Sequence, residues 1–506
     1  MTASPLLTPQ FASPPMNSMT QRHDKYHTSR QSAVWLALLM PVTVIILLYA
    51  SRMFGSEILL TWTICILVLP LLRGACKRVV GKDCGTTREI VAVYLFLSCI
   101  GFLWAIENHI NYGFTFSPRR DDILYFRAIT DISHGESLHG ATLYEILAGA
   151  FVAIVRLPWL RSAPLEHIDI LPFNWLVGSF VVSISARLGS AKDGDTPPMT
   201  QALCFAYLLT QSIFIFNIVH LYRDVLMLLF SLFTVSFTLR NKTLAAAIST
   251  IPVFFIRGMN GMLLCLLVGL HAFIRKSLTL QNRNTLIIKI VLALAVGFIA
   301  LRSLPSEGLR RISSPWASES QMDSKSLAEY VDSRKVDLGL GSYTDAASFT
   351  GRTRMVPLVG DIVTVVSYLF GQLSFNPGSI RQSQVLYVDD SEFGRKCHTD
   401  VYSPLIWHDA LRILMFMVVF PWIIVGGKRL LLHGGSAEQA FVLFLITSAL
   451  VLNAVSFQNR HSLFLVIMAP YLIKHQHESP YSIKEKQLFS LSRIGACVLV
   501  LIAFLK

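Results

Sequence analysis

Long apolar runs alternate with short polar stretches along most of the chain. A helix that crosses a bilayer needs about 17–25 mainly apolar residues. Such runs lie near residues 33–50, 57–72, 90–106, 142–158, 169–186, 200–219, 225–239, 285–301, 404–425, 438–456 and 487–505, with shorter ones at 243–256, 258–274 and 461–473. Because lipid offers the backbone no hydrogen bonds, each run is predicted to be helical. The pattern predicts an all-α, polytopic transmembrane helical bundle of about 11–14 spans.

The composition excludes an ordinary soluble domain. Of the 506 residues, 53% are hydrophobic and only 15% are charged, which is typical of a polytopic membrane protein. Lys and Arg (44) outnumber Asp and Glu (31), but most basic residues lie in short loops, where they orient helices. We therefore expect no nucleic-acid partner. The eight cysteines form no CxxC pair, which favours buried apolar side chains over a zinc site or a disulfide framework.

The basic loops predict which helix ends face the cytoplasm. By the positive-inside rule, the cytoplasmic segments are the tail before residue 33 and the stretches 73–88, 240–242, 275–283, 428–429 and 474–486. The N-terminus is then cytoplasmic. The opposite, external face would carry the Asp121–Asp122 loop, Arg223 with Asp224, Arg257, the polar stretch 302–355, the 375–403 loop, and Arg460 with His461. Charged groups from distant parts of the chain would thus share one face.

One apolar run must stay on the outer side for this orientation to hold. Three crossings between the acidic loop and Arg223 would leave Arg223 in the cytoplasm. The run 142–158 contains Glu145 and Arg156 and is predicted to lie in the interface or to re-enter the bilayer. The stretch 356–374 is predicted to behave in the same way.

The predicted organisation has four parts. They are a disordered cytoplasmic tail (1–32), an N-terminal transmembrane bundle (33–301) with an external Asp-Asp loop (107–141), an external loop or cap with an interfacial helix (302–403), and C-terminal transmembrane helices (404–506). Caps over a membrane site often gate it.

Asp121 and Asp122 are the leading candidates for chemistry. They lie side by side in a polar stretch, shortly before Tyr125, close to a bilayer that disfavours adjacent charges. Arginines on both sides of the pair would keep it ionised. One carboxylate could then act as a general base toward an acceptor hydroxyl, while the other orients that hydroxyl or holds a divalent cation, Mg²⁺ or Mn²⁺. A solvated loop pair or a helix N-cap explains the same residues without chemistry.

Three cationic positions are candidates for binding a phosphate. Arg223, next to Asp224, offers a guanidinium that grips phosphate with two hydrogen bonds. Arg257 lies between two short apolar stretches, where a cation needs an anionic partner. Arg460 and His461 put a fixed and a titratable cation at one helix end. The alternatives are a snorkelling anchor for Arg223, a plain turn for Arg257, and simple positive flanking of a helix for Arg460–His461.

A second polar cluster contains residue types that ligate metals. The spacing of His398, Asp400, His408 and Asp409 fits no standard site, and His408–Asp409 is expected to open the helix after Pro404. No metal is assigned there.

With these residues assembled, the chain resembles bacterial polytopic membrane glycosyltransferases of the GT-C type and the related exopolysaccharide or O-antigen polymerases. Asp121-Asp122-Ile-Leu-Tyr125 resembles the GT-C aspartate motif. Asn174 to Gly178, then Arg223–Asp224 and Arg257, resemble the Asn/Gly, Arg-Lys-Asp and Arg-Pro series of polysaccharide-assembly membrane proteins. Arg460 to Pro470 resembles their late Arg-Tyr…Pro segment. The chain departs from these patterns at Leu221–Tyr222, Gly258 and His461, where Lys, Pro and Tyr are usual.

The resemblance implies an enzyme of the bacterial inner membrane that transfers sugars from polyprenyl phosphate or diphosphate at the external face. It implies Asp121 and Asp122 as catalytic residues, and it implies a substrate-binding set of Tyr125, Arg223, Asp224, Arg257, Arg460 and His461. Expected partners are the polyprenyl-linked sugar or oligosaccharide, membrane lipid and other polysaccharide-assembly proteins. Two other functions remain open: a flippase of lipid-linked oligosaccharide, and a non-catalytic component of polysaccharide export.

Overall fold

Helices make up nearly all of the part of the chain that the structure describes. The structure is a computed structural model, and it describes residues 17–55, 57–112, 120–135, 141–155, 165–189, 197–277, 365–366, 369–370, 381–387, 396–402, 406–455, 462–475 and 482–504. The first helices are α1 (Asn17–Phe54), α2 (Glu57–Val80), the 3-10 turn η1 (Gly81–Cys84), α3 (Thr87–Tyr112), α4 (Arg120–Ser133), α5 (Leu143–Val155) and α6 (His167–Arg187). The middle of the chain forms α8 (Pro198–Leu209), α9 (Ser212–Val219), α10 (Asp224–Leu239), α11 (Thr243–Ile256) and α12 (Gly258–Ser277). The last helices are α18 (Ile406–His433), α19 (Ser436–Val455), α20 (Leu463–Val466), α21 (Ala469–Lys474) and α22 (Ile483–Phe504).

Six helical segments within the described residues are long and apolar enough to cross a membrane. They are Leu36–Phe54, Glu57–Cys84, Thr87–Ile110, His167–Arg187, Gly258–Lys276 and Ala410–His433. Shorter apolar segments of 10–17 residues are Leu143–Val155, Pro198–Leu209, Asp224–Leu239, Thr243–Ile256, Ser436–Leu452 and Leu463–Lys474. The prediction of an all-α, polytopic helical bundle embedded in a membrane is confirmed.

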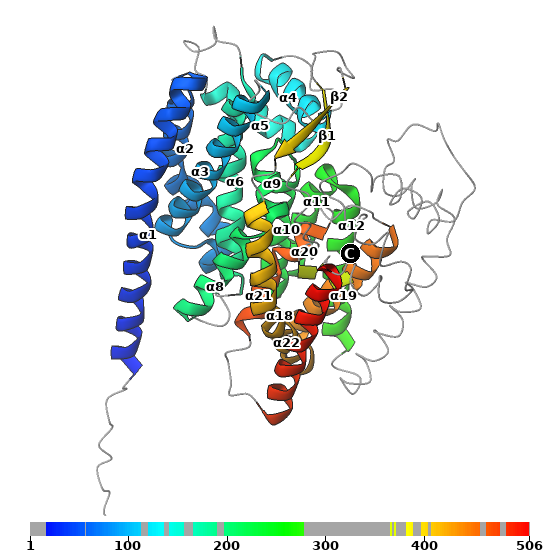
Figure 1. Cartoon of the computed structure of the whole chain (residues 1–506). Helices are drawn as coiled ribbons and strands as arrows, with labels where there is room; N and C mark the ends of the chain where they lie inside the picture. Colours follow the sequence, from blue (N-terminus) through cyan, green and yellow to red (C-terminus); the bar gives the residue numbers. More distant parts are fainter. Residues whose placement is uncertain are drawn as a thin grey trace, which may run out of the picture.

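Helix α6 lies at the centre of the bundle, and α1 lies at its edge (Figure 1). In the apolar stretch of α6, 94% of the residues are buried, whereas the corresponding figure for α1 is 17%. Large apolar side chains on the outer helices, such as Leu71 on α2 and Leu244 on α11, are exposed on the protein surface. In a membrane this surface contacts lipid tails, so its exposure carries no hydrophobic cost.

Acidic residues at several helix starts have a structural explanation. Thr142 and Glu145 form a capping box at α5: the Glu145 carboxylate accepts the Thr142 N–H, and the Thr142 hydroxyl accepts the Glu145 N–H at 3.4 Å. Glu145 therefore opens the helix and does not interrupt it. Within the described residues, α5 spans 13 residues, and residues 156–158 of the apolar run lie outside the description. The prediction that the run 142–158 does not cross the bilayer stays a prediction.

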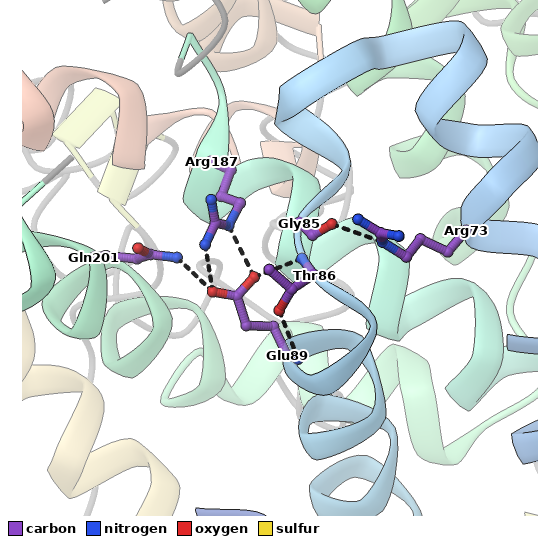
Figure 2. Close-up of polar contacts among 6 residues, drawn as sticks. All are labelled: Arg73, Gly85, Thr86, Glu89, Arg187 and Gln201. Carbon is purple, nitrogen blue, oxygen red and sulfur yellow. Dashed lines mark hydrogen bonds and ion pairs between the residues drawn. The ribbon is translucent and has the colours of Figure 1, made fainter. Parts of the chain in front are cut away.

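A polar cluster joins the ends of three helices (Figure 2). The Glu89 carboxylate, in the first turn of α3, accepts hydrogen bonds from the Nε of Arg187 at 2.9 Å and from the Nε2 of Gln201 at 3.0 Å. Arg187 is the last residue of α6, and Gln201 lies on α8. Beside this cluster, the Nε of Arg73 donates to the carbonyl of Gly85 at 3.0 Å. We call this end of the bundle the Glu89 end.

Helices α6 and α10 pack against each other and run in the same direction. Arg240, which caps the C-terminus of α10, binds Asp83 through its Nη2 at 3.1 Å, and Asp83 belongs to the turn just before α3. Both helices therefore end at the Glu89 end. Their first turns lie at the opposite end, beside α4 and α5, where His167 at the start of α6 contacts the ring of Phe126 on α4 with centroids 6.4 Å apart. We call this the α4 end.

Two predicted segments differ from the structure. Helix α1 begins at Asn17, so the second half of the predicted disordered tail is helical. No proline lies between Asn17 and the apolar run, so a helix nucleated in the membrane can extend into this polar segment.

The predicted 375–403 loop contains an antiparallel strand pair, β1 (Arg381–Tyr387) and β2 (Lys396–Tyr402). Strand pairing satisfies the backbone groups that a plain loop leaves to water.

Candidate functional site

The central feature of the α4 end is an ion pair between Asp224 and Arg257. Asp224 is the first residue of α10, and Arg257 is the one non-helical residue between α11 and α12. The Asp224 carboxylate accepts hydrogen bonds from both the Nε and the Nη2 of Arg257, the latter at 3.1 Å. The Asp224 side chain is 0% exposed, and that of Arg257 is 13% exposed. This two-point geometry is the arrangement in which Arg binds a carboxylate or a phosphate most tightly.

Arg223, the residue before Asp224, adds a second cation to the same turn. It occupies the N-cap position of α10, and its side chain makes no capping hydrogen bond. Its Nε is buried and has no hydrogen-bond partner among the described residues. The turn and its ion-pair partner thus contribute two arginines, Arg223 and Arg257, and the carboxylate of Asp224. A buried guanidinium nitrogen of this kind is stabilised when an anion comes within hydrogen-bond distance.

The backbone that carries Arg223 and Asp224 is held by a side chain of α6. Residues 220–223 connect α9 to α10, and we call them, together with Asp224 at the start of α10, the α9–α10 corner. The Nδ2 of Asn174 donates to the carbonyl of His220 at 2.7 Å, and the Oδ1 of Asn174 accepts the Tyr144 hydroxyl at 3.0 Å. Asn174, His220 and Tyr144 are all fully buried. The corner is thus tied to α6 and, through Tyr144, to α5.

Aromatic rings line the same region. The His220 ring lies 5.7 Å from that of Trp104 and 4.3 Å from that of Phe216, and the Tyr222 ring is 5.7 Å from both His220 and Phe216. Such rings exclude water and strengthen the electrostatic interactions beside them. The charged corner therefore lies in a low-dielectric part of the bundle.

Tyr125 connects this region to the acidic pair. Its ring meets that of Tyr144 edge to face, with centroids 5.8 Å apart. Tyr125 lies on α4, one turn after Asp121 and Asp122, and residues three and four apart share one face of a helix. The side chains of Asp121 and Asp122 lie outside the described part of the structure, but their backbone forms the first turn of α4. Acidic residues in a first turn also stabilise the helix itself.

The structure brings together part of the predicted site. Asp224 and Arg257 form an ion pair, Arg223 precedes Asp224, and Tyr125 is linked to the same corner through Tyr144 and Asn174. Arg460 and His461 lie outside the described residues. The catalytic and binding roles of all these residues stay predictions.

Tyr144 was not predicted as a site residue. It stands in an apolar run, where a tyrosine has no feature that distinguishes it from a core residue. The flanking Thr142 and Glu145 match a capping-box pattern, and this pattern is the signal that could have placed Tyr144 at a helix start.

The sequence leaves a divalent cation open as a cofactor. Among the residues that the structure describes, no group of three or more His, Cys, Asp or Glu residues stands close enough together to hold a metal ion. The side chains of Asp121, Asp122, His398, Asp400, His408 and Asp409 lie outside that description, although the backbone of His408 and Asp409 lies in the first turn of α18, as predicted.

The chain matches no family model, no curated protein and no solved structure in the comparisons made with them.

Proposed function

We propose that the protein is an integral-membrane glycosyltransferase or polysaccharide polymerase that uses sugars linked to polyprenyl phosphate or diphosphate. The observation that carries the proposal is the charged corner itself. Arg257 pairs with the Asp224 carboxylate, Arg223 directly precedes Asp224 in the same turn, and the Arg223 Nε has no hydrogen-bond partner among the described residues. A lipid phosphate is a membrane ligand whose charge and geometry suit two guanidinium groups.

The proposal assigns different roles to the acids and the arginines. Asp121 or Asp122 acts as the general base that takes the proton of an acceptor hydroxyl. Arg223 and Arg257 stabilise the charge that develops on the phosphate when its bond to the sugar breaks. The spatial support is the contact path from the first turn of α4, through Tyr125 and Tyr144, to the corner. On this proposal the α4 end faces the outside of a bacterial inner membrane, with the N-terminus in the cytoplasm.

A flippase of lipid-linked oligosaccharide is the alternative. Transporters of that kind place their charged residues near the middle of the membrane, often at broken helices. Asp224 stands at the first residue of α10 and Arg257 between the ends of α11 and α12. Charges at helix ends favour chemistry at a membrane surface over passage through the bilayer.

The test is consumption of a donor by purified protein in nanodiscs. A panel of sugars linked to polyprenyl phosphate or diphosphate is incubated with the protein and an acceptor glycolipid, and mass spectrometry follows donor and product. The Asp121→Asn and Asp122→Asn variants are compared with Asp131→Asn, a control that removes an exposed carboxylate from the same helix. We expect at least one of the first two variants to lose about 100-fold or more in kcat, the range that general bases contribute, while Asp131→Asn keeps wild-type activity.

The same variants separate catalysis from helix stability. If Asp121 and Asp122 only cap α4, their Asn variants keep both the unfolding temperature and the turnover near the wild-type values, since Asn caps helices about as well as Asp does. Full turnover in both variants would reject the proposal that Asp121 or Asp122 is the general base of a glycosyltransferase. Movement of the intact lipid between leaflets without product would favour the flippase.

A further inference from the structure

Asn174 joins two parts of the α4 end that are far apart in the sequence. Its amide contacts the carbonyl of His220 on one side and the hydroxyl of Tyr144 on the other, at 2.7 and 3.0 Å. A carbonyl oxygen only accepts hydrogen bonds, so the NH₂ group of Asn174 must face His220. Its Oδ1 then faces Tyr144, whose hydroxyl donates. The chemistry of the two partners thus fixes the orientation of the amide.

The backbone carbonyl of His220 accepts two hydrogen bonds at the start of the α9–α10 corner. His220 has an extended backbone, and its carbonyl also accepts the N–H of Tyr222 at 3.0 Å. Arg223 and Asp224 follow directly. A hydrogen bond to this carbonyl therefore fixes the start of the turn that presents the guanidinium of Arg223 and the carboxylate of Asp224.

Helix α6 is shaped to bring Asn174 close to the corner. Gly178 lies one turn after Asn174 and so on the same face of the helix. A Cβ atom at Gly178 would collide with the Cδ1 of Ile218 on α9. The missing side chain lets α6 approach α9 closely, and this approach puts Asn174 within reach of the His220 carbonyl.

On its other side, Asn174 connects to the acidic helix. The Tyr144 ring packs edge to face on that of Tyr125, and Tyr125 lies one turn after Asp121 and Asp122 on α4. Helices α4 and α5 pack against each other, so they form one hairpin over the first turns of α6. Asn174 is the polar link between this hairpin and the cationic corner.

We infer that Asn174 is a positioning residue that sets the α9–α10 corner, with Arg223 and Asp224, against the hairpin that carries Asp121 and Asp122. Its kinetic consequence rests on the proposed function, whereas its structural consequence does not. General base and phosphate-binding groups must be held in fixed geometry, because a small displacement costs a large factor in rate.

The structural test is hydrogen exchange of the full-length protein in nanodiscs, followed by mass spectrometry. The variant is Asn174→Ala, and the control is Ser185→Ala on the same helix. Ser185 is also fully buried and also donates to a backbone carbonyl, that of Ile467, but it lies near the Glu89 end. We expect exchange at residues 221–227 to rise about fivefold to tenfold in Asn174→Ala, the factor that one lost hydrogen bond corresponds to, and to stay at the wild-type rate in Ser185→Ala.

A second variant keeps the test decisive if Asn174→Ala does not fold. Tyr144→Phe removes only the hydroxyl and preserves the ring that packs on Tyr125. It frees the Oδ1 of Asn174, so exchange at the corner should rise, by less than in Asn174→Ala. The inference would be overturned if the corner amides of Tyr144→Phe exchange at the wild-type rate. Equal increases in exchange in Asn174→Ala and Ser185→Ala would also overturn it.

The kinetic test uses a polyprenyl-phosphate-linked sugar as the donor. We expect kcat to fall about tenfold in Asn174→Ala, with KM within about twofold of wild type, because misplaced groups act mainly on the transition state. Ser185→Ala should keep both parameters. If corner exchange responds as expected but the wild type consumes no donor, the proposed function fails and the positioning role of Asn174 stands. If the donor is consumed and neither exchange nor kcat responds to Asn174→Ala, the positioning role fails alone.

Discussion

The carboxylate of Asp224 binds the guanidinium of Arg257 across 33 residues of sequence, through two hydrogen bonds. Asp224 begins α10, which ends at the Glu89 end, and Arg257 separates α11 from α12. The pair therefore fixes the relative position of three helices at the α4 end. The Nε of the neighbouring Arg223 has no hydrogen-bond partner within the described residues, and on the proposed function this cation binds the lipid phosphate.

Removal of Arg257 should destabilise the protein strongly. Arg257→Gln leaves the fully buried Asp224 carboxylate without its partner, and breaking a buried pair costs about 3–5 kcal/mol. The Asp224→Asn/Arg257→Gln double variant should recover part of this loss, because no unpaired charge remains. The measurement is the free energy of unfolding in detergent for the two single variants and the double variant. Additive losses in this cycle would mean that the two side chains do not interact.

Two adjacent glycines in α18 should respond oppositely to alanine. A Cβ at Gly426 would collide with the carbonyl oxygen of Leu472 on α21, whereas a Cβ at Gly427 meets no atom within 4 Å. Gly426→Ala must move a backbone and should lower the unfolding temperature or prevent folding. Gly427→Ala should be neutral or stabilising by up to about 1 kcal/mol, because alanine favours a helix. Equal unfolding temperatures would contradict the close packing of α18 on α21.

The contact between α18 and α22 should weaken in acid. Hydrogen bonds from the Arg429 guanidinium, at 2.8 Å and 3.1 Å, and from the Ser482 N–H lower the pKa of Glu485 from 4.5 to about 2. A lowered pKa means that the stabilisation is complete above about pH 5 and is lost as the pH falls toward 2. Glu485→Gln should remove this dependence. Unfolding temperatures of both proteins between pH 3 and pH 7 are the measurement, and a constant difference between them would rule out the linkage.

Residues at the α4 end and the Glu89 end should be accessible from opposite sides of the membrane. His134, after α4, and Lys242, before α11, are both exposed. In a background without native cysteines, His134→Cys should react with an impermeant maleimide on intact cells, and Lys242→Cys should react only in inverted vesicles. Labelling of both from one side would reject the predicted orientation.

The sequence predicts the helices well because a membrane imposes their length and apolar character. For Arg223, Asp224 and Arg257 it predicts a shared membrane face but not their contacts. Hydropathy does not encode which helices are neighbours. The contact of Asn174 with His220 depends on the close approach of α6 and α9 at Gly178, a property of the folded bundle. The start of α1 and the β1–β2 pair were missed because a polar segment with turn residues carries no apolar period.

Binding of a polyprenyl phosphate tests the central claim most directly. The purified protein in nanodiscs is titrated with the lipid, and native mass spectrometry counts the bound molecules. We predict that Arg223→Gln weakens binding about tenfold or more, the loss expected for a charge-assisted hydrogen bond, while Lys242→Gln, at the other end of the bundle, binds as the wild type does. Equal affinity of the wild type and Arg223→Gln would contradict the account.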